Sequence, residues 1–308
     1  MLTCVYIASP SFSGSTLLAM LLGGHPSVAT IGEMKGVRQD LTSYACSCGA
    51  LFVKCPFWLR LIDALKERGF VFDLSDDQSV PAFRMPGSAI GDRFMRMAYG
   101  RRAFETLRSL VLGSWPGYSR RLDYLRRYNE TFMQLVVQFY GASLFLDSSK
   151  DPVRIRYLAR IPSLQLYVVH LVRDGRGVVN SARKNLGMPA REASIEWRET
   201  HLEIERVTKQ FCGRRVLRVR YEDLCADPDG VLATALEFIT ASGLITAAEA
   251  AQRELHVLGN RMRLKGVLPI RPDESWKDEM SGSDLDTFAS LAGNLNARYG
   301  YGVARGKR

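Results

Sequence analysis

The sequence contains no apolar run of the roughly 18 to 20 residues that a helix needs to cross a membrane. Its first residues, Met1–Ala8, also lack the basic leader and the apolar length of a secretory signal peptide. These two absences predict a cytoplasmic protein without a membrane span. Residues 2–8 are continuously apolar instead, as expected for a parallel strand buried on both faces.

Cysteine is scarce as well, since 308 residues contain only six, too few for a disulfide-stabilised secreted fold. Three of them stand close together: Cys46 and Cys48 precede Gly49, and Cys55 precedes Pro56. A zinc ion with a fourth ligand from elsewhere is one interpretation of this group. No fourth ligand stands at zinc-finger spacing, so we favour a tight loop with structural thiols, or one disulfide, and predict no metal.

Acidic residues are outnumbered, with 32 Asp and Glu against 42 Lys and Arg, which gives a formal net charge of +10. An excess of this size favours anionic ligands such as phosphates, nucleotides or acidic sugars. The basic residues are dispersed and no nucleic-acid-binding module is recognisable. Nucleic acid is therefore not an expected partner.

Strands alternate with helices over most of the chain, which predicts an α/β fold with a parallel sheet flanked by helices. The expected strands are Leu2–Ala8, Ser143–Leu146, Leu164–Val172 and Val216–Tyr221. The expected helices are Thr16–Leu22, Pro152–Arg160, Gly177–Asn185, Ile195–Phe211, Val231–Thr240, Ala247–Leu258 and Leu285–Arg298. We interpret residues 1–308 as one domain.

The alternation stops in residues 57–140, where the periodicity is helical over Phe57–Lys66, Phe104–Leu112 and Leu122–Phe139. Stretches rich in Pro, Gly and Asp separate these segments. We therefore predict a helical insertion in the α/β frame.

The loop Ser9–Thr16 follows the first strand and precedes the first helix, where a phosphate-binding loop would lie. Gly14 permits close backbone approach to an anion, and Ser13, Ser15 and Thr16 offer hydroxyl donors. In the Walker pattern G-x-x-x-x-G-K-[ST], Ser9 replaces the first Gly and Ser15 replaces the Lys. The loop favours one phosphate or a phosphosulfate over ATP, and a plain turn capped by Thr16 is the alternative.

A second anion site is predicted where the strand Leu164–Val172 ends at Arg173 and a helix carries Ser181 eight residues later. A guanidinium can bind a phosphate bidentately, and the hydroxyl adds a donor. Parallel sheets bind ligands at this edge.

With both elements present, the chain resembles the PAPS-dependent sulfotransferases, a family with a P-loop-like architecture. In that family an S-G-[ST]-T loop, matching Ser13–Thr16, binds the 5′-phosphosulfate of the donor. An R-D-x-R…S element, matching Arg173, Asp174, Arg176 and Ser181, binds its 3′-phosphate. Further matching pieces, in order, are His25-Pro26, Gly32-Glu33, Asp147-Ser-Ser-Lys150-Asp-Pro152, Arg220-Tyr221-Glu222-Asp223-Leu224, His256…Gly259-Asn260 and Trp276 before Arg298-Tyr-Gly300.

The resemblance implies sulfuryl transfer from PAPS to an acceptor hydroxyl, with an amine as the second choice of acceptor and PAP as the second product. It implies that Tyr221 packs on adenine and that a basic loop with Arg261, Arg263 and Lys265 closes over the nucleotide. No metal is needed, since fixed cations take its place. The acceptor is a small molecule, a carbohydrate or a lipid-linked group, in a pocket built by the insertion with Trp58, Phe83, Trp115 and Tyr118. No oligomeric state is indicated.

The sequence departs from the family at Phe12, where Arg or Lys usually stands. We predict that Lys150 supplies the missing charge and stabilises the leaving phosphate. Glu33 is the predicted general base, because it returns to the phosphate loop soon after the first helix. Positioning of a loop is the alternative role for Glu33, and His25 and His256 are second-choice bases.

Two other functions remain open from the sequence. One is a P-loop nucleotide kinase, which the absence of a Lys after Gly14 weakens. The other is a non-catalytic protein that binds PAP, PAPS or an acidic polymer, which Phe12 supports.

Overall fold

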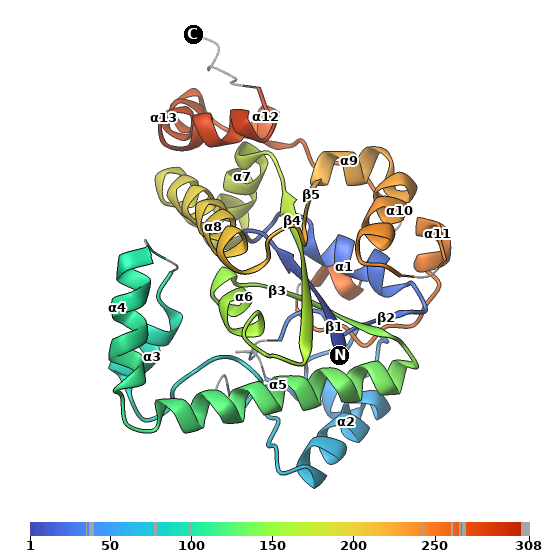
Figure 1. The fold of residues 1–308 in the computed structure, drawn as a ribbon. Helices are drawn as coiled ribbons and strands as arrows, with labels where there is room; N and C mark the ends of the chain where they lie inside the picture. Colours follow the sequence, from blue (N-terminus) through green and yellow to red (C-terminus); the bar gives the residue numbers. More distant parts are fainter. Residues whose placement is uncertain are drawn as a thin grey trace.

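The first strand, β1 (Leu2–Ala8), occupies the centre of the sheet because its side chains are apolar on both faces. The computed structural model describes residues 1–302 except 35, 37–39, 77–78, 99, 101, 242, 260, 265 and 267–268. In it β1 pairs in parallel with β3 (Leu144–Lys150) on one side and β4 (Leu164–Val172) on the other. The flanking strands are β2 (Val28–Thr30) and β5 (Val216–Arg220), and the order is β2-β3-β1-β4-β5 (Figure 1).

Every pairing in this sheet is parallel, so all five strands deliver their carboxyl ends to one edge. That edge receives the loops after Ala8, Thr30, Lys150, Val172 and Arg220. The predicted α/β class with a P-loop-like architecture is confirmed. The three-residue strand β2 was not predicted, because it is too short to show a periodicity.

Helices cover both faces of the sheet (Figure 1). Val5 and Ile7 of β1 share a buried cluster with α1 (Ser15–Gly23) and α10 (Pro228–Phe238). The alternate residues Tyr6 and Ala8 belong to the opposite cluster. Helices that contribute to it include α5 (Tyr118–Tyr140), α6 (Pro152–Leu158) and α8 (Ala190–Phe211). A third cluster joins α7 (Gly175–Leu186) to α13 (Gly282–Arg298).

The described residues between 56 and 140 form only helices as regular elements. Three of these are α2 (Pro56–Glu67), α4 (Arg102–Gly113) and the long α5, whose side toward the sheet is buried. The additional helix α3 (Ala89–Arg96) was not predicted, and it begins at Ser88, whose hydroxyl accepts from the backbone N–H of Gly91. Trp58, which we expected in the acceptor pocket, is fully buried and stacks on Phe72 in the core.

The predicted helix Ala247–Leu258 is wrong in its second half, because α11 covers only Ala247–Ala250. Beyond it the chain is irregular, and Leu258 donates its N–H to the carbonyl of Ile31 at 2.7 Å, bridging to Gly32. The remaining short elements are η1 (Phe52–Lys54), α9 (Tyr221–Ala226), η2 (Arg261–Leu264) and α12 (Trp276–Glu279).

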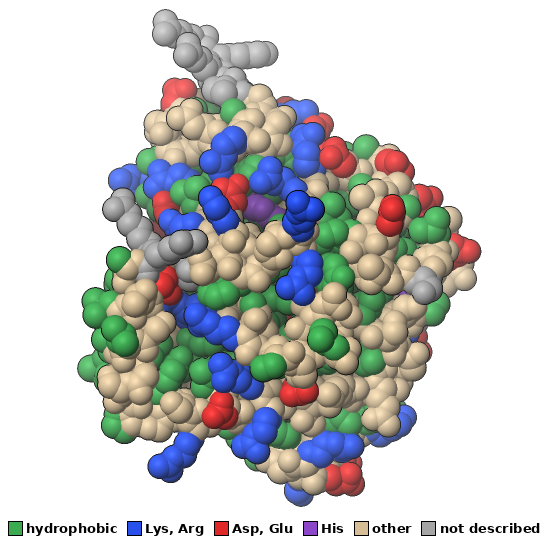
Figure 2. Space-filling model, viewed as in Figure 1, with side chains coloured by type: hydrophobic (Ala, Val, Ile, Leu, Met, Phe, Trp, Pro, Cys, Tyr) green, Lys and Arg blue, Asp and Glu red, His purple; other side chains and the backbone are tan. Residues whose placement is uncertain are grey.

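None of the helices in the described part of the chain combines the length and apolarity needed to cross a bilayer. Lys and Arg side chains are spread at separate places over the face that carries α8 and α5 (Figure 2).

Candidate active site

The loop after β1 forms a cradle at the start of α1. Gly14 is the N-cap of the helix with φ +90°, a conformation that is strained for other residues. A Cβ at Gly14 would lie 2.5 Å from Cδ2 of Tyr221, so only glycine fits between the loop and that ring. The hydroxyls of Ser9 and Ser13 are buried and have no hydrogen-bond partner among the described residues. Buried donors without partners point to a ligand as their partner.

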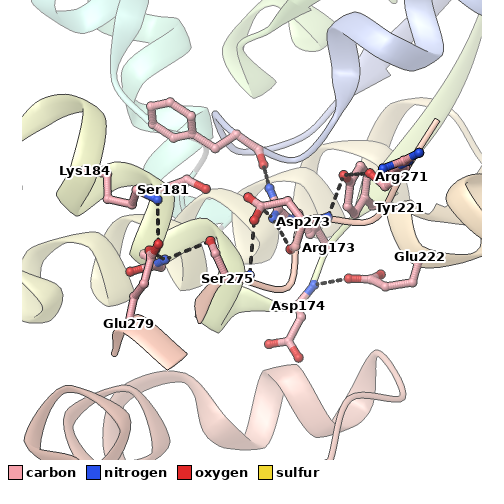
Figure 3. A network of polar contacts seen from close by, with 12 residues as sticks. Arg173, Asp174, Ser181, Lys184, Tyr221, Glu222, Arg271, Asp273, Ser275 and Glu279 are labelled. Atoms are coloured by element: carbon pink, nitrogen blue, oxygen red, sulfur yellow. Dashed lines mark hydrogen bonds and ion pairs between the residues drawn. The ribbon is translucent and has the colours of Figure 1, made fainter. Parts of the chain in front are cut away.

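Arg173 approaches the same loop from the end of β4. Its Nη1 donates to the carbonyl of Phe12 at 2.8 Å, and its Nη2 donates to the carbonyl and the carboxylate of Asp273 at 2.8 and 3.0 Å. Its guanidinium lies over the ring of Tyr221, 4.6 Å from the ring centroid. Figure 3 shows Arg173 close to Tyr221 and Asp273, with Ser181 on α7 beside this group.

One cavity of about 180 Å³ joins the two predicted anion sites. It is lined by Phe12, Gly14, Ser15, Thr16, Leu17, Lys150, Arg173, Ser181, Tyr221, Met262 and Asp273. Ser13 is fully buried beneath this lining. The chain thus gathers hydroxyls, a helix N-terminus and two cations around one small cavity, an arrangement suited to an anionic ligand.

Glu33 and Lys150 form an ion pair at the carboxyl edge of the sheet. The Lys150 Nζ lies 2.6 Å from the Glu33 Oε1, and their side chains are 14% and 5% exposed. Lys150 ends β3 with φ +70°, a left-handed conformation that is unusual outside glycine. Strained backbone of this kind is concentrated at functional sites.

The sulfotransferase family model matches residues 5–242. The chain belongs to the sulfotransferase family. A search of curated proteins gave no match.

Three solved structures that resemble this sulfotransferase carry the name sulfotransferase and have low sequence identity to it. The sulfotransferase domain of the Synechococcus PCC 7002 olefin synthase is 20% identical, with a TM-score of 0.47, over 99% of this chain and 96% of that one. The sulfotransferase domain of the curacin biosynthetic pathway is 17% identical, with a TM-score of 0.48, over 99% of both chains. A sulfotransferase from Mycobacterium avium is 15% identical, with a TM-score of 0.45, over 99% of this chain and 78% of that one.

At the position where the family usually carries a cation, Phe12 has φ +63° and packs its ring against the cluster between α7 and α13. Its contribution to the cavity is therefore apolar, apart from the carbonyl that accepts from Arg173. Lys150 and Arg173 are the cations in the lining formed by described residues.

Several predicted residues lie away from this cavity. Arg176 is buried against Asp174, with 2.5 Å between Nη2 and Oδ2, and covers the ring of Trp276. Arg263 donates to the carbonyls of Gly259 and Ala45 and is not in the lining. Lys265 lies outside the described residues.

The two second-choice bases are also held elsewhere. The Nδ1 of His25 accepts from the N–H of Ser27 at 3.1 Å, and its Nε2 lies 3.2 Å from the carbonyl of Gly243. His25 thus stabilises the turn after α1. His256 faces the cysteine group, with its Nδ1 3.4 Å from Cys55 Sγ.

Sequence reasoning missed three residues of the cavity, Leu17, Met262 and Asp273. Burial works to raise the pKa of Asp273, but hydrogen bonds from Ser275 and Arg173 outweigh it and lower the pKa. The carboxylate is therefore ionised and paired with Arg173. Asp273 follows Arg173 by 100 residues in an irregular segment, so no spacing pattern indicated it.

A second cavity, of about 440 Å³, lies beside the ion pair. Its lining is Met34, Gly36, Ala82, Phe83, Arg84, Arg96, Ser149, Asp151, Val153 and Arg154. Met34 follows Glu33 in the chain, and Ser149 and Asp151 flank Lys150. The Glu33–Lys150 pair is therefore adjacent to both cavities.

Proposed function

We propose that this sulfotransferase transfers a sulfuryl group from PAPS to an acceptor hydroxyl. The observation that carries the proposal is the single cavity in which the loop after β1, Arg173, Ser181 and Lys150 meet. ATP lacks a 3′-phosphate, so it leaves the second of the two anion sites without a ligand.

The residues fit the donor. The partnerless hydroxyl of Ser13, the glycine at position 14 and the N-terminus of α1 suit a phosphosulfate. Arg173 and Ser181 would hold the 3′-phosphate, and Tyr221 offers a ring face for adenine. When bound, the donor supplies a sulfuryl group attached to a phosphate that can leave.

Glu33 and Lys150 have different roles in the proposed transfer. Glu33 accepts the proton of the acceptor hydroxyl as the new O–S bond forms, and Lys150 stabilises the negative charge that grows on the departing phosphate as the old S–O bond breaks. Without ligands the two groups neutralise each other at 2.6 Å. An anion beside Lys150 draws its ammonium group away from Glu33 and leaves the carboxylate available as a base.

The second cavity is the proposed acceptor site. Phe83, Arg84 and Arg96 come from the helical insertion, and Met34, Ser149 and Asp151 come from the sheet edge. Apolar and basic groups thus line it together, which suits an acceptor with an apolar body and an acidic group.

The direct test is incubation of the protein with ³⁵S-labelled PAPS and a broad panel of hydroxyl and amine acceptors. Label in an acceptor, formed without added Mg²⁺, supports the proposal. Calorimetry with PAP in EDTA and with ATP plus Mg²⁺ then separates the alternatives. Tight ATP binding together with weak PAP binding would favour a kinase, whereas PAP binding without label transfer to any acceptor would favour a non-catalytic binding protein.

A further inference from the structure

Residues 45–55 and the distant His256 bring four metal-binding side chains together. Cys46 and Cys48 lie in the tight loop 45–51, Cys55 immediately precedes α2, and His256 follows α11. The ligand atoms of these four residues all lie within 4.8 Å of one another. The loop is closed by backbone hydrogen bonds from Cys46 N–H to the Ala50 carbonyl and from Gly49 N–H to the Cys46 carbonyl.

Three of the six separations among the four ligand atoms fit a tetrahedral site for one ion. The sulfurs of Cys48 and Cys55 are 3.7 Å apart, and His256 Nδ1 lies 3.4 Å from Cys55 Sγ and 3.8 Å from Cys46 Sγ. Zn–S bonds of about 2.3 Å and Zn–N bonds of about 2.0 to 2.1 Å give tetrahedral edges of roughly 3.8 Å for S···S and roughly 3.6 Å for S···N. The observed separations agree with both values.

The surroundings orient the ligands. The N–H groups of Phe57 and Trp58, at the start of α2, face the sulfur of Cys55, and the Cys48 N–H faces that of Cys46. The His256 ring stacks on Phe57, with 4.5 Å between centroids and 6° between planes. Its second nitrogen, Nε2, lies 3.6 Å from the carboxylate of Glu254, the kind of partner that zinc-binding histidines commonly have.

We propose that Cys46, Cys48, Cys55 and His256 bind one structural zinc ion. Three thiolates and one imidazole in tetrahedral array are a typical ligand set for zinc. Four protein ligands leave no open position, so the ion is structural and takes no part in transfer. A disulfide between Cys48 and Cys55 would use two of the four groups and leave unexplained why Cys46 and His256 converge on them.

The zinc ion would stabilise the segments that pack beside Glu33 in the candidate active site. Two residues beyond His256, Leu258 pairs with Gly32, and the next residue, Gly259, packs against Glu33, where a Cβ would lie 3.0 Å from the carboxylate. On the other side of the cluster, the Ala45 carbonyl accepts from Arg263 at 2.7 Å. Zinc therefore ties the loop 45–51 to the segment that contacts the general base.

The test is the metal content of the full-length protein, purified from zinc-supplemented cells without a metal-affinity step and measured by mass spectrometry of the elements. We expect about one zinc per chain for the native protein and for Cys212→Ser, a change at a buried cysteine outside the cluster. Cys48→Ser and His256→Ala are expected to lose most of the zinc, because the loss of one ligand lowers the affinity for zinc at least ten-fold. A native protein with less than about 0.1 zinc per chain, or a Cys48→Ser variant with an undiminished content, overturns the proposal.

Further measurements start from the native chain, so the test does not depend on variants alone. Replacement by Co²⁺ should give the strong visible absorption of a tetrahedral thiolate site, and an octahedral spectrum overturns the proposal. Chelator should lower the unfolding temperature of the native protein but not that of zinc-free His256→Ala. An intact mass lower by two hydrogens without zinc would assign the cysteines to a disulfide instead. Label transfer from PAPS is scored separately, so loss of the zinc site leaves the proposed function standing.

Discussion

Lys150 and Glu33 hold each other at 2.6 Å between Nζ and Oε1, in a position where both side chains are largely shielded from water. They reach it from the ends of neighbouring strands, β2 and β3, which pair in parallel. Lys150 follows Ser149, whose hydroxyl accepts the N–H of Met34 at 2.8 Å, so the two segments are also fastened by a hydrogen bond. In the proposed mechanism, this neutral pair holds the base and the cation until an anion enters.

Glu33→Gln should lower kcat by about 10² to 10⁴, because it removes proton transfer while keeping the size of the side chain. PAP affinity should change little. Glu196→Gln, at an exposed position on α8, is the matched control. Steady-state label transfer together with PAP calorimetry checks both expectations. If Glu33→Gln keeps the native activity, Glu33 is not the general base and only positions a loop.

Lys150→Ala should lower the transfer rate by about 10² to 10³, equivalent to about 2 to 4 kcal/mol of lost transition-state stabilisation. The residue at position 12 is Phe, so no cation there can compensate for the lost charge of Lys150. Lys184→Ala removes a lysine that pairs with Glu279 on the surface and should leave the rate within about two-fold. Single-turnover rates at saturating donor make the comparison. Equal rates for the two variants would exclude Lys150 from catalysis.

Arg173→Ala should weaken PAP binding by about 30- to 150-fold, that is by about 2 to 3 kcal/mol. Arg191→Ala, an exposed change on α8, should have no effect. Because Arg173 also holds the Phe12 carbonyl, thermal unfolding of both variants must accompany the calorimetry. A folded Arg173→Ala variant with native PAP affinity would remove this residue from the donor site.

The parts of the site that belong to a strand–loop–helix unit could be predicted from the sequence. The bounds of β1 and β4 were predicted as they are, and the residues that follow them, Gly14 and Arg173, line one cavity. Contacts that join distant irregular segments could not be predicted. The pairing of Arg173 with Asp273 and the approach of His256 to Cys55 depend on tertiary packing, which leaves no periodic trace in the sequence.

Gly14→Ala should cost more than the strain of its dihedral angle, because the new Cβ would lie 2.5 Å from the ring of Tyr221. Gly117 is a matched control: it is also a helix N-cap with positive φ, and nothing lies within 4 Å of a Cβ there. Gly117→Ala should destabilise the fold by about 1 to 2 kcal/mol, the cost of the left-handed conformation. Gly14→Ala should exceed this and also weaken PAP binding, since Tyr221 must move. Equal unfolding free energies would contradict the predicted clash.

A buried histidine pair should make the fold sensitive to acid. His170 Nε2 and His201 Nδ1 are 2.8 Å apart, so one ring donates to the other. Burial lowers the pKa of His170 from 6.5 to about 3 and lowers that of His201 well below 6.5. Both rings are therefore neutral when folded and take up protons when unfolded. Their contribution to stability is complete above pH 6.5 and is lost as the pH falls from 6.5 toward 3.

At pH 5 each histidine should lower the free energy of unfolding by about 2 kcal/mol relative to pH 7.5, because 1.5 pH units lie below the unfolded pKa. His201→Gln keeps a hydrogen-bonding partner for His170 but removes one of the two titrating rings. The loss of stability between pH 7.5 and pH 5 should therefore be smaller in the variant by about 2 kcal/mol. Urea unfolding of both proteins at the two pH values measures this difference, in which the titration of all other groups cancels. An identical loss in the two proteins would mean that His201 is protonated as easily in the native state as in the unfolded chain.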